Sequence, residues 1–427
     1  MSKLILNARR IARLQTFRTA KKWFATHLHL WRFGNHGRQR FQNDSRYNLE
    51  YVSSGFADHI DESCDDTALL SRICTAYNKA VTQQQAHLTV ASWDRLREGP
   101  LAPSIRALRE NNTVALGRMY RNFYRDPCSA GLLAAPGGMS RAYFDGQIKD
   151  RYRRFYLSHV LYRFDYWNEL TSGSFSLKDL SGPGVGNPFG VMIDGTHIGV
   201  GSEYSHYCAH RFGSLISSSA AQRTSVAEIG GGFGAIAYYL LRDYSPLTYF
   251  NFDLPERVAL SSYYLMKAFP GQRFLLYGEE PLAGETLSQA DVVMMPLSAL
   301  DAMSPSSVDV TFSSNGLVNL LPDAMSESLK KIESITRRSL LYIGNETASK
   351  PVVEYFDREQ SSFALADRRT SGWHSHKVSG AGVGGAAGLS ASTLLEQVFS
   401  RKPRAENSDT RSPSLPREVV QAVQTIT

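Results

Sequence analysis

Residues 226–235 read Val226-Ala227-Glu228-Ile229-Gly230-Gly231-Gly232-Phe233-Gly234-Ala235, an apolar run that passes into a cluster of glycines. The apolar run predicts a buried strand, and the apolar spacing of residues 235–241 predicts a helix directly after the glycines. A backbone that turns back beneath a ligand needs positive φ angles and no Cβ, and glycine meets both needs at little cost. The rest of the chain can be placed around this strand, turn and helix.

Two carboxylates stand at the ends of neighbouring predicted strands. Glu228 lies two residues before the first glycine, at the end of a strand that is otherwise apolar. A buried carboxylate is costly unless it meets a partner, so we expect a ligand with a positive charge or hydroxyl donors there. The second strand, residues 247–252, is followed by Asp253, at the position where a Rossmann-like sheet binds a ribose diol.

The motifs Glu228-x-Gly230-x-Gly232-x-Gly234 and Phe252-Asp253-Leu254-Pro255 resemble those of class I S-adenosylmethionine-dependent methyltransferases. This resemblance implies S-adenosylmethionine as the cofactor and a set of cofactor-binding residues at the ends of the strands. Those residues are Glu228, Gly230, Gly231, Gly232, Gly234, Asp253 and Leu254, with Pro296, Leu297 and Ser298 beside the adenine and Asn315 toward the sulfonium or the acceptor. The segment ahead of the first strand commonly roofs the cofactor in this fold, which adds Tyr204 and, as further candidates, Glu203 and His206.

Two other interpretations stay open. Gly230-x-Gly232-x-x-Ala235 also satisfies the pattern of dinucleotide-binding enzymes, which would make the protein an NAD-dependent oxidoreductase. Glu228 favours the methyltransferase, because a carboxylate at this strand end repels a pyrophosphate and attracts the ammonium and sulfonium of S-adenosylmethionine. The other alternative is a non-catalytic scaffold of the same fold that acts in envelope polysaccharide assembly.

Two segments ahead of the glycines are similar to sugar O-methyltransferases associated with surface polysaccharide synthesis. They are Met119-Tyr120-Arg121-Asn122-Phe123 and Gly186-Asn187-Pro188, and the similarity extends over residues 115–346. It implies methyl transfer to a sugar hydroxyl of a glycan or glycolipid intermediate. The family often carries an acidic residue after the fourth strand, where this chain has Asn319.

A sugar hydroxyl has a high pKa, so methyl transfer to it calls for a base that removes the proton during attack. The candidate histidines are His206, His374 and His376, and the sequence does not choose among them. Some sugar methyltransferases instead use magnesium held by carboxylates, and Asp301 and Asp309 keep that alternative open. No adjacent acidic pair occurs at the predicted strand ends, so we predict no metal ligands.

The order of the predicted elements indicates an α/β fold. Strands at 291–296, 307–315 and 340–346 alternate with helices, which is typical of a parallel sheet covered on both faces. We therefore expect a Rossmann-like class I methyltransferase sheet, preceded by a mainly helical N-terminal region. The expected parts are a basic amphipathic arm at 1–40, the helical region at 41–180, the methyltransferase domain at 181–400 and a disordered tail at 401–427.

The composition, with 42% hydrophobic and 20% charged residues, is that of a soluble globular protein. The sequence shows no apolar run long enough to span a membrane, no signal peptide and no paired cysteine spacing. These features favour a cytoplasmic location without a zinc site.

The formal net charge of +7 arises in the arm at 1–40, which holds ten Lys and Arg and no acidic residue. Apolar and basic residues alternate there in a way compatible with a helix on an anionic membrane surface, at the inner face of the membrane. The alternatives are an arm that docks on the protein or one that stays free. No nucleic-acid-binding motif accompanies the charge, so we expect no nucleic-acid partner.

Overall fold

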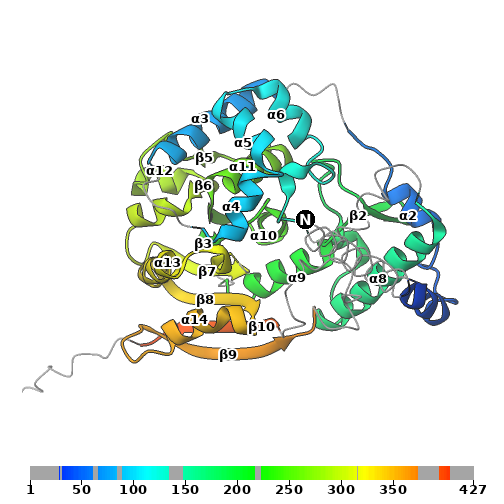
Figure 1. Cartoon of the computed structure of the whole chain (residues 1–427). Coiled ribbons are helices and arrows are strands. Elements are labelled where there is room, and N and C mark those ends of the chain that lie inside the picture. Colours follow the sequence, from blue (N-terminus) through cyan, green and yellow to red (C-terminus); the bar gives the residue numbers. More distant parts are fainter. Residues whose placement is uncertain are drawn as a thin grey trace, which may run out of the picture.

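The computed structural model describes residues 28, 31–60, 66–83, 89–133, 148–216, 223–314, 316–373 and 394–403 (Figure 1). Before residue 180 the described chain is helical. Its helices are α2 (Glu50–Gly55), α3 (Thr67–Gln83), α4 (Ala91–Glu98), α5 (Ala102–Arg109), α6 (Thr113–Tyr120) and α8 (Asp150–Leu170), and residues 31–40 are also helical. Short 3-10 turns follow at Pro127–Ser129 and Leu177–Leu180.

Within the described residues, eight strands form one sheet in the order β5-β6-β4-β3-β7-β8-β10-β9. The strands are β3 (Thr224–Ile229), β4 (Leu247–Asp253), β5 (Phe274–Leu276), β6 (Val292–Pro296), β7 (Val308–Ser314), β8 (Thr336–Asn345), β9 (Phe363–Ser371) and β10 (Leu394–Arg401). The strands from β5 to β8 pair in parallel, and β10 is antiparallel to both β8 and β9. The predicted Rossmann-like sheet is confirmed.

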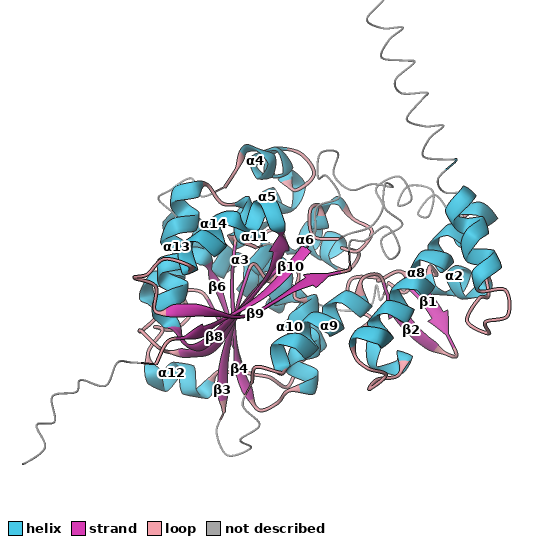
Figure 2. Cartoon of the chain, turned by 90° about the horizontal axis from the view of Figure 1, so that it is seen from below, coloured by secondary structure: helices cyan, strands magenta, loops and turns pink. Residues whose placement is uncertain are grey.

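Helices cover both faces of this sheet, as Figure 2 shows. They are α9 (Ser202–Gly213), α10 (Ala235–Asp243), α11 (Pro255–Ala268), α12 (Gly284–Gln289), α13 (Pro322–Ile335) and α14 (Glu346–Phe356). Val226 and Tyr249 point into one core with α9, α10 and α11, whereas their neighbours Ala227 and Phe250 point into a second core with α13 and α14. Every residue of β4 is buried, because a parallel strand covered on both faces meets no water.

The N-terminal helices extend the first of these cores. Helix α3 packs on α11, and α8 packs on α9. A two-stranded hairpin, β1 (Gly190–Ile193) and β2 (Thr196–Gly199), lies with α2 and α8 to one side of the sheet (Figures 1 and 2). None of the described helices is long and apolar enough to cross a membrane.

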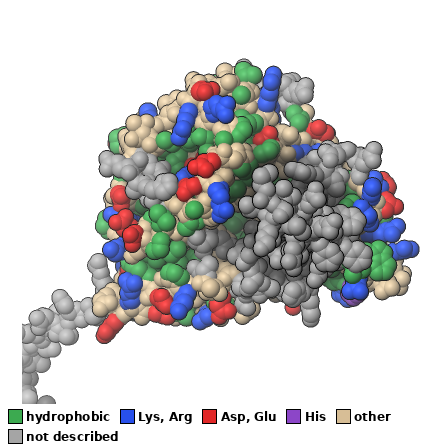
Figure 3. All heavy atoms as spheres, in the orientation of Figure 1, with side chains coloured by type: hydrophobic (Ala, Val, Ile, Leu, Met, Phe, Trp, Pro, Cys, Tyr) green, Lys and Arg blue, Asp and Glu red, His purple; other side chains and the backbone are tan. Residues whose placement is uncertain are grey.

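The surface that faces the viewer in Figure 3 carries charges of both signs over its described part. Lys and Arg side chains are interspersed there with Asp and Glu side chains, and no extended area of one sign stands out. The basic excess of the sequence therefore belongs to the arm at 1–40, of which the structure describes residue 28 and residues 31–40.

Candidate functional site

The candidate site lies where the strand order reverses. From β3 the chain builds one side of the sheet with β4, β5 and β6, and then returns to the other side of β3 as β7. In open α/β sheets a ligand binds in the crevice at such a switch point, beyond the carboxyl ends of the strands. Here those ends are occupied by Glu228, Asp253, Pro296 and Ser314.

The glycine turn between β3 and α10 has no room for a side chain at Gly230 or Gly231. A Cβ on Gly230 would stand 2.4 Å from the Cα of Gly316, and one on Gly231 would stand 2.6 Å from Oδ1 of Asn251. Gly230 also has a φ of +81°, a region that other L-residues rarely adopt. Gly232 and Gly234 have positive φ angles as well, so the turn depends on glycine for both its shape and its close contacts.

Glu228 lies directly beneath this turn and is 2% exposed. Its Oε2 accepts a hydrogen bond of 2.5 Å from the hydroxyl of Tyr249 on β4. Burial raises the pKa of Glu228 to about 7. The hydrogen bond from Tyr249 lowers the pKa in part, and the charge of Asp253 raises it further. In the described chain, no Lys or Arg forms an ion pair with Glu228, so the carboxyl lacks a cationic partner.

Asp253 ends β4 and lies beside the same turn, 4% exposed. Its Oδ2 accepts from the backbone N–H of Gly232 at 2.9 Å, and its Oδ1 accepts from that of Leu254 at 2.7 Å. The guanidinium of Arg257 lies 3.7 Å from Oδ1. Burial raises the pKa of Asp253, and the Arg257 charge opposes that increase. The glycine turn and the end of β4 are thus joined through this carboxylate.

Leu254, Pro296 and Leu297 form the neighbouring apolar border of the site. Pro296 pairs with Asp253 in the sheet, and Leu254 packs in a small cluster with Trp93 and Leu101. Leu297 is buried, whereas Ser298 is exposed. The structure thus brings the residues predicted to border the adenine next to Asp253.

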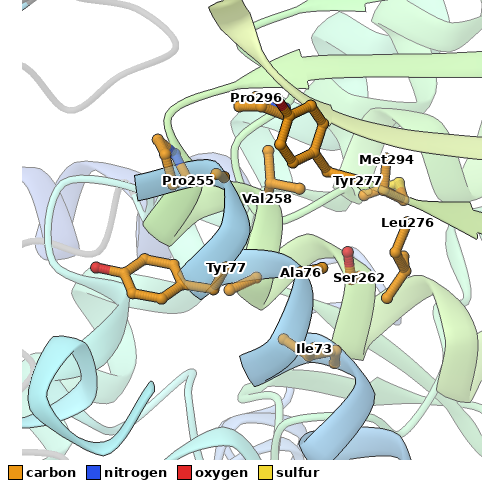
Figure 4. Close-up of a pocket in the computed structure, with 12 residues that line it drawn as sticks. Ile73, Ala76, Tyr77, Pro255, Val258, Ser262, Leu276, Tyr277, Met294 and Pro296 are labelled. Carbon is orange, nitrogen blue, oxygen red and sulfur yellow. The ribbon is translucent and has the colours of Figure 1, made fainter. Parts of the chain in front are cut away.

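A small apolar cavity of about 20 Å³ lies behind this border, between α3, α11 and the ends of β5 and β6 (Figure 4). Pro255 and Val258 line it from α11, Tyr277 and Pro296 line it from the ends of β5 and β6, and Tyr77 lines it from α3. Its volume holds about one water molecule. The cavity is therefore part of the packing that supports the border, since a cofactor would not fit into it.

The segments around Asn122 and Asn187 meet behind the glycine turn. Nδ2 of the buried Asn187 donates to Oδ1 of Asn122 at 2.8 Å. A Cβ on Gly186 would stand 2.0 Å from the ring of Phe123, and that ring packs on Phe233 of the glycine turn at a centroid distance of 5.3 Å. These segments support the turn from the side of the helical region.

At the end of β7, the hydroxyl of Tyr204 on α9 lies 2.9 Å from Oγ of Ser314. The ring of Tyr204 packs edge-on against Trp373, whose side chain is fully buried at the end of β9. Arg163 of α8 lies over Trp373 and forms an ion pair with Glu203. This aromatic and charged cluster borders the side of the site opposite Asp253.

His206 lies on a different face of α9 and is 2% exposed. Its ring is surrounded by Trp167, Phe175 and Tyr239. The indole N–H of Trp167 donates to its Nδ1 at 3.2 Å, so Nδ1 acts as an acceptor. Burial lowers the pKa of His206 to about 4 despite the nearby charge of Asp243. The structure does not bring His206 together with Glu228 and Asp253.

Three predicted site residues, Asn315, His374 and His376, lie outside the described residues. The described chain reaches Trp373, one residue before His374, at the end of the site that Tyr204 borders.

The carboxylates considered as magnesium ligands have other partners. Asp301 pairs with Lys331 at 3.0 Å, and Asp309 pairs with Arg337 at 2.9 Å. In the part of the chain that the structure describes, no three His, Cys, Asp or Glu side chains gather in a way that could hold a metal ion.

Sequence reasoning missed two residues that touch the site, Arg257 and Trp93. Arg257 stands four residues after Asp253, a spacing that brings two side chains together on the first turn of a helix. That signal was present in the sequence. Trp93 could not have been found in this way, because it reaches Arg257 from α4 through the tertiary fold alone.

No protein-family model matches the sequence, and no curated protein matches it either. Similar solved structures include magnesium protoporphyrin IX methyltransferase from Synechocystis PCC 6803 with bound S-adenosylmethionine, at 12% identity and a TM-score of 0.31 over 47% of this chain and 80% of that one. An rRNA methylase from Streptococcus thermophilus matches at 12% identity and a TM-score of 0.29, over 47% and 96% of the two chains. The tRNA methyltransferase TrmK from B. subtilis matches at 10% identity and a TM-score of 0.29, over 46% of this chain and 66% of that one. The described part of the chain has the predicted Rossmann-like α/β architecture, preceded by a helical N-terminal region.

Proposed function

We propose that this protein is an S-adenosylmethionine-dependent O-methyltransferase that acts on a sugar hydroxyl of a glycan or glycolipid intermediate. The observation that carries the proposal is the pair of buried carboxyls, Glu228 and Asp253, on either side of a turn that admits only glycine. Such a site offers negative charge and hydrogen-bond acceptors where the strands end.

The residues fit this cofactor by a test that is independent of the motifs. Asn251 is fully buried below the turn, and its Oδ1 has no hydrogen-bond partner among the described residues. Glu228 is buried without a cation, as described above. Buried polar groups in native proteins are almost always paired, so these acceptors favour a ligand that brings donors and positive charge. The amino acid part of S-adenosylmethionine carries both.

The same features argue against the dinucleotide alternative. An ionised Glu228 would face the pyrophosphate of NAD at short range and with little screening, because the site is buried. The ammonium of S-adenosylmethionine would instead be attracted. For this reason we favour the methyltransferase over an NAD-dependent oxidoreductase.

When bound, the cofactor supplies a methyl group that its sulfonium makes electrophilic. The chain has to align the acceptor with that methyl group, exclude water and take up the proton of the hydroxyl. Tyr204, backed by the buried Trp373, would form an aromatic wall at the end of β7, and aromatic faces suit sugar rings. We propose His374 or His376 of the sequence candidates as the base, because His206 is enclosed.

The sugar acceptor is supported by the segments around Asn122 and Asn187, which contact each other and support the glycine turn. The proteins in the solved structures named above are methyltransferases of magnesium protoporphyrin IX, tRNA and rRNA. Their acceptors therefore do not favour a sugar, and the acceptor class rests on these two segments.

The function is tested by comparing surface glycans from cells that lack the gene with glycans from cells in which the gene is restored. We expect restoration to add the mass of one methyl group to a sugar residue, as measured by mass spectrometry. Purified protein should transfer a labelled methyl group from S-adenosylmethionine to glycans from the deleted strain. Unchanged glycan masses, together with no labelled transfer, would favour the non-catalytic scaffold.

A further inference from the structure

We propose that Arg257 is a second residue that recognises the cofactor ribose. Asp253 would accept hydrogen bonds from the ribose diol, and Arg257 would donate hydrogen bonds to the same diol. Trp93 of the N-terminal region would hold the Arg257 side chain in position. This inference rests on the proposed function, because it assumes that the ribose of S-adenosylmethionine lies at Asp253.

The first observation is that Arg257 is buried although not all of its N–H donors have hydrogen-bond partners among the described residues. It is 6% exposed, and its ion pair with Asp253 spans 3.7 Å, which is longer than a hydrogen bond. Its Nε is buried and has no hydrogen-bond partner among the described residues. A guanidinium carries five N–H donors, and removing them from water without partners is expensive. Donors left open beside the end of β4 indicate a ligand with acceptors.

The second observation is a platform that holds the guanidinium in place. The centre of the Arg257 guanidinium lies 3.8 Å from the ring centroid of Trp93, a close cation–π contact. The indole N–H of Trp93 donates to Oε1 of Glu256 at 2.8 Å, and Nε of Arg97 donates to the same oxygen at 2.7 Å. The ring is therefore anchored to α11, the helix that carries Arg257, and its plane is fixed.

The platform also connects the two sides of the site. Arg97 donates to Oγ1 of Thr89 at 3.0 Å, and Thr89 forms a β-bridge with Leu320, which follows β7. The N-terminal region thus contacts the end of β4 through Trp93 and the segment after β7 through Thr89. This arrangement makes α4 part of the cofactor site and not only a cover for the core.

The chemistry of the diol explains why two residues would be used. Each ribose hydroxyl is both a donor and an acceptor. The carboxylate of Asp253 can take the hydrogens, and it already uses one lone pair on each oxygen for the N–H groups of Gly232 and Leu254. Arg257 can donate to the hydroxyl oxygens, which Asp253 cannot do. Together they would select a ribose over a deoxyribose.

The test is the calorimetric affinity of the full chain for adenosylhomocysteine and for its 2′-deoxy and 3′-deoxy analogues. We expect the parent protein to bind at least one deoxy analogue about ten- to a hundredfold more weakly than adenosylhomocysteine. This range corresponds to the loss of a hydrogen bond to a charged group. In Arg257→Met the affinity ratio between the ribose ligand and that analogue should fall by about tenfold. Arg257→Lys, which keeps the charge but lacks the planar fork, should also lower the ratio.

Arg242→Met is the matched control, because Arg242 also lies over an aromatic ring, that of Tyr239, but pairs with Asp243 and takes no part in the Trp93 platform. It should leave the ratio as in the parent, whatever its effect on thermal stability. A merely structural role of Arg257 would weaken both ligands equally, and an unchanged ratio in Arg257→Met and Arg257→Lys would overturn the inference. If the parent binds no adenosylhomocysteine, the proposed function fails first, and this inference fails with it.

Discussion

At the scale of single residues, Glu228 connects folding stability to ligand binding. Its pKa of about 7 lies above the ordinary value of 4.5, mainly because the carboxyl is buried. Between these two pH values the folded protein holds a proton that the unfolded chain has released. The stability that this proton provides is therefore complete below pH 4.5 and is lost as the pH rises through 7.

This titration predicts the behaviour of Glu228→Gln in the empty protein. Gln cannot ionise, and its amide oxygen can still accept the hydrogen bond from Tyr249. We expect the variant to melt a few degrees above the parent at pH 8 and close to it at pH 5, because the cost of a shift of this size is on the order of 3 kcal/mol. Scanning calorimetry at the two pH values measures the difference. An equal difference at pH 5 and pH 8 would contradict the assigned titration.

The sequence was sufficient to predict where Glu228 and Asp253 stand, because strand ends in a parallel sheet meet at one edge. The sequence was not sufficient to predict which side chains contact these two carboxylates. Tyr249 reaches Glu228 across the register of two strands, and Trp93 reaches the site from a helix more than a hundred residues earlier. Such contacts depend on how elements pack, and no local spacing encodes them.

At the scale of elements, the strands buried on both faces were predictable from their apolar runs. The hairpin of β1 and β2 was missed, because its glycines and the preceding prolines read as a domain boundary. Strand β9 was missed because its burial alternates little and most of its residues face solvent. Strand β10 has an apolar run but follows a glycine-rich stretch, and the antiparallel end of the sheet was therefore not expected.

The helix at 31–40 shows how the basic arm joins the folded protein. Phe33 packs on Phe155 of α8 at 5.2 Å and also contacts Tyr162, whereas Trp31 is 59% exposed. Residues 31–40 of the arm are thus anchored, and the exposed Trp31 stands at the start of this anchored part. Aromatic residues next to basic charges suit the interface of an anionic membrane.

We therefore propose that residues 1–30 bring the protein to an anionic membrane surface, and we predict the effect of deleting them. The deletion should reduce binding to phosphatidylserine-containing vesicles at low salt, since exposed charges are screened beyond about 10 Å at 0.1 M salt. The affinity for adenosylhomocysteine should stay near that of the full chain, because Phe33 and its contacts remain. Vesicle sedimentation at two salt concentrations gives the answer, and binding that is unaffected by the deletion would refute the assignment.

At the scale of the whole molecule, the site is assembled from parts that lie far apart in the sequence. The helical region contributes Trp93, α9 contributes Tyr204, and the sheet contributes Glu228 and Asp253. The helical region packs into the same core as the sheet, so it is not an independent appendage. We accordingly expect cofactor binding to require the described N-terminal helices as well as the sheet.

The central claim is that the ends of β3 and β4 bind S-adenosylmethionine, and calorimetric titration with its product tests it most directly. We predict that the parent protein binds adenosylhomocysteine and not NAD, and that Asp253→Asn binds adenosylhomocysteine about ten- to a hundredfold more weakly. A loss of affinity in this variant would not come from a weakened helix start, because α11 begins after Leu254 without a side-chain cap from Asp253. Tight binding of NAD with no response to adenosylhomocysteine would contradict the account.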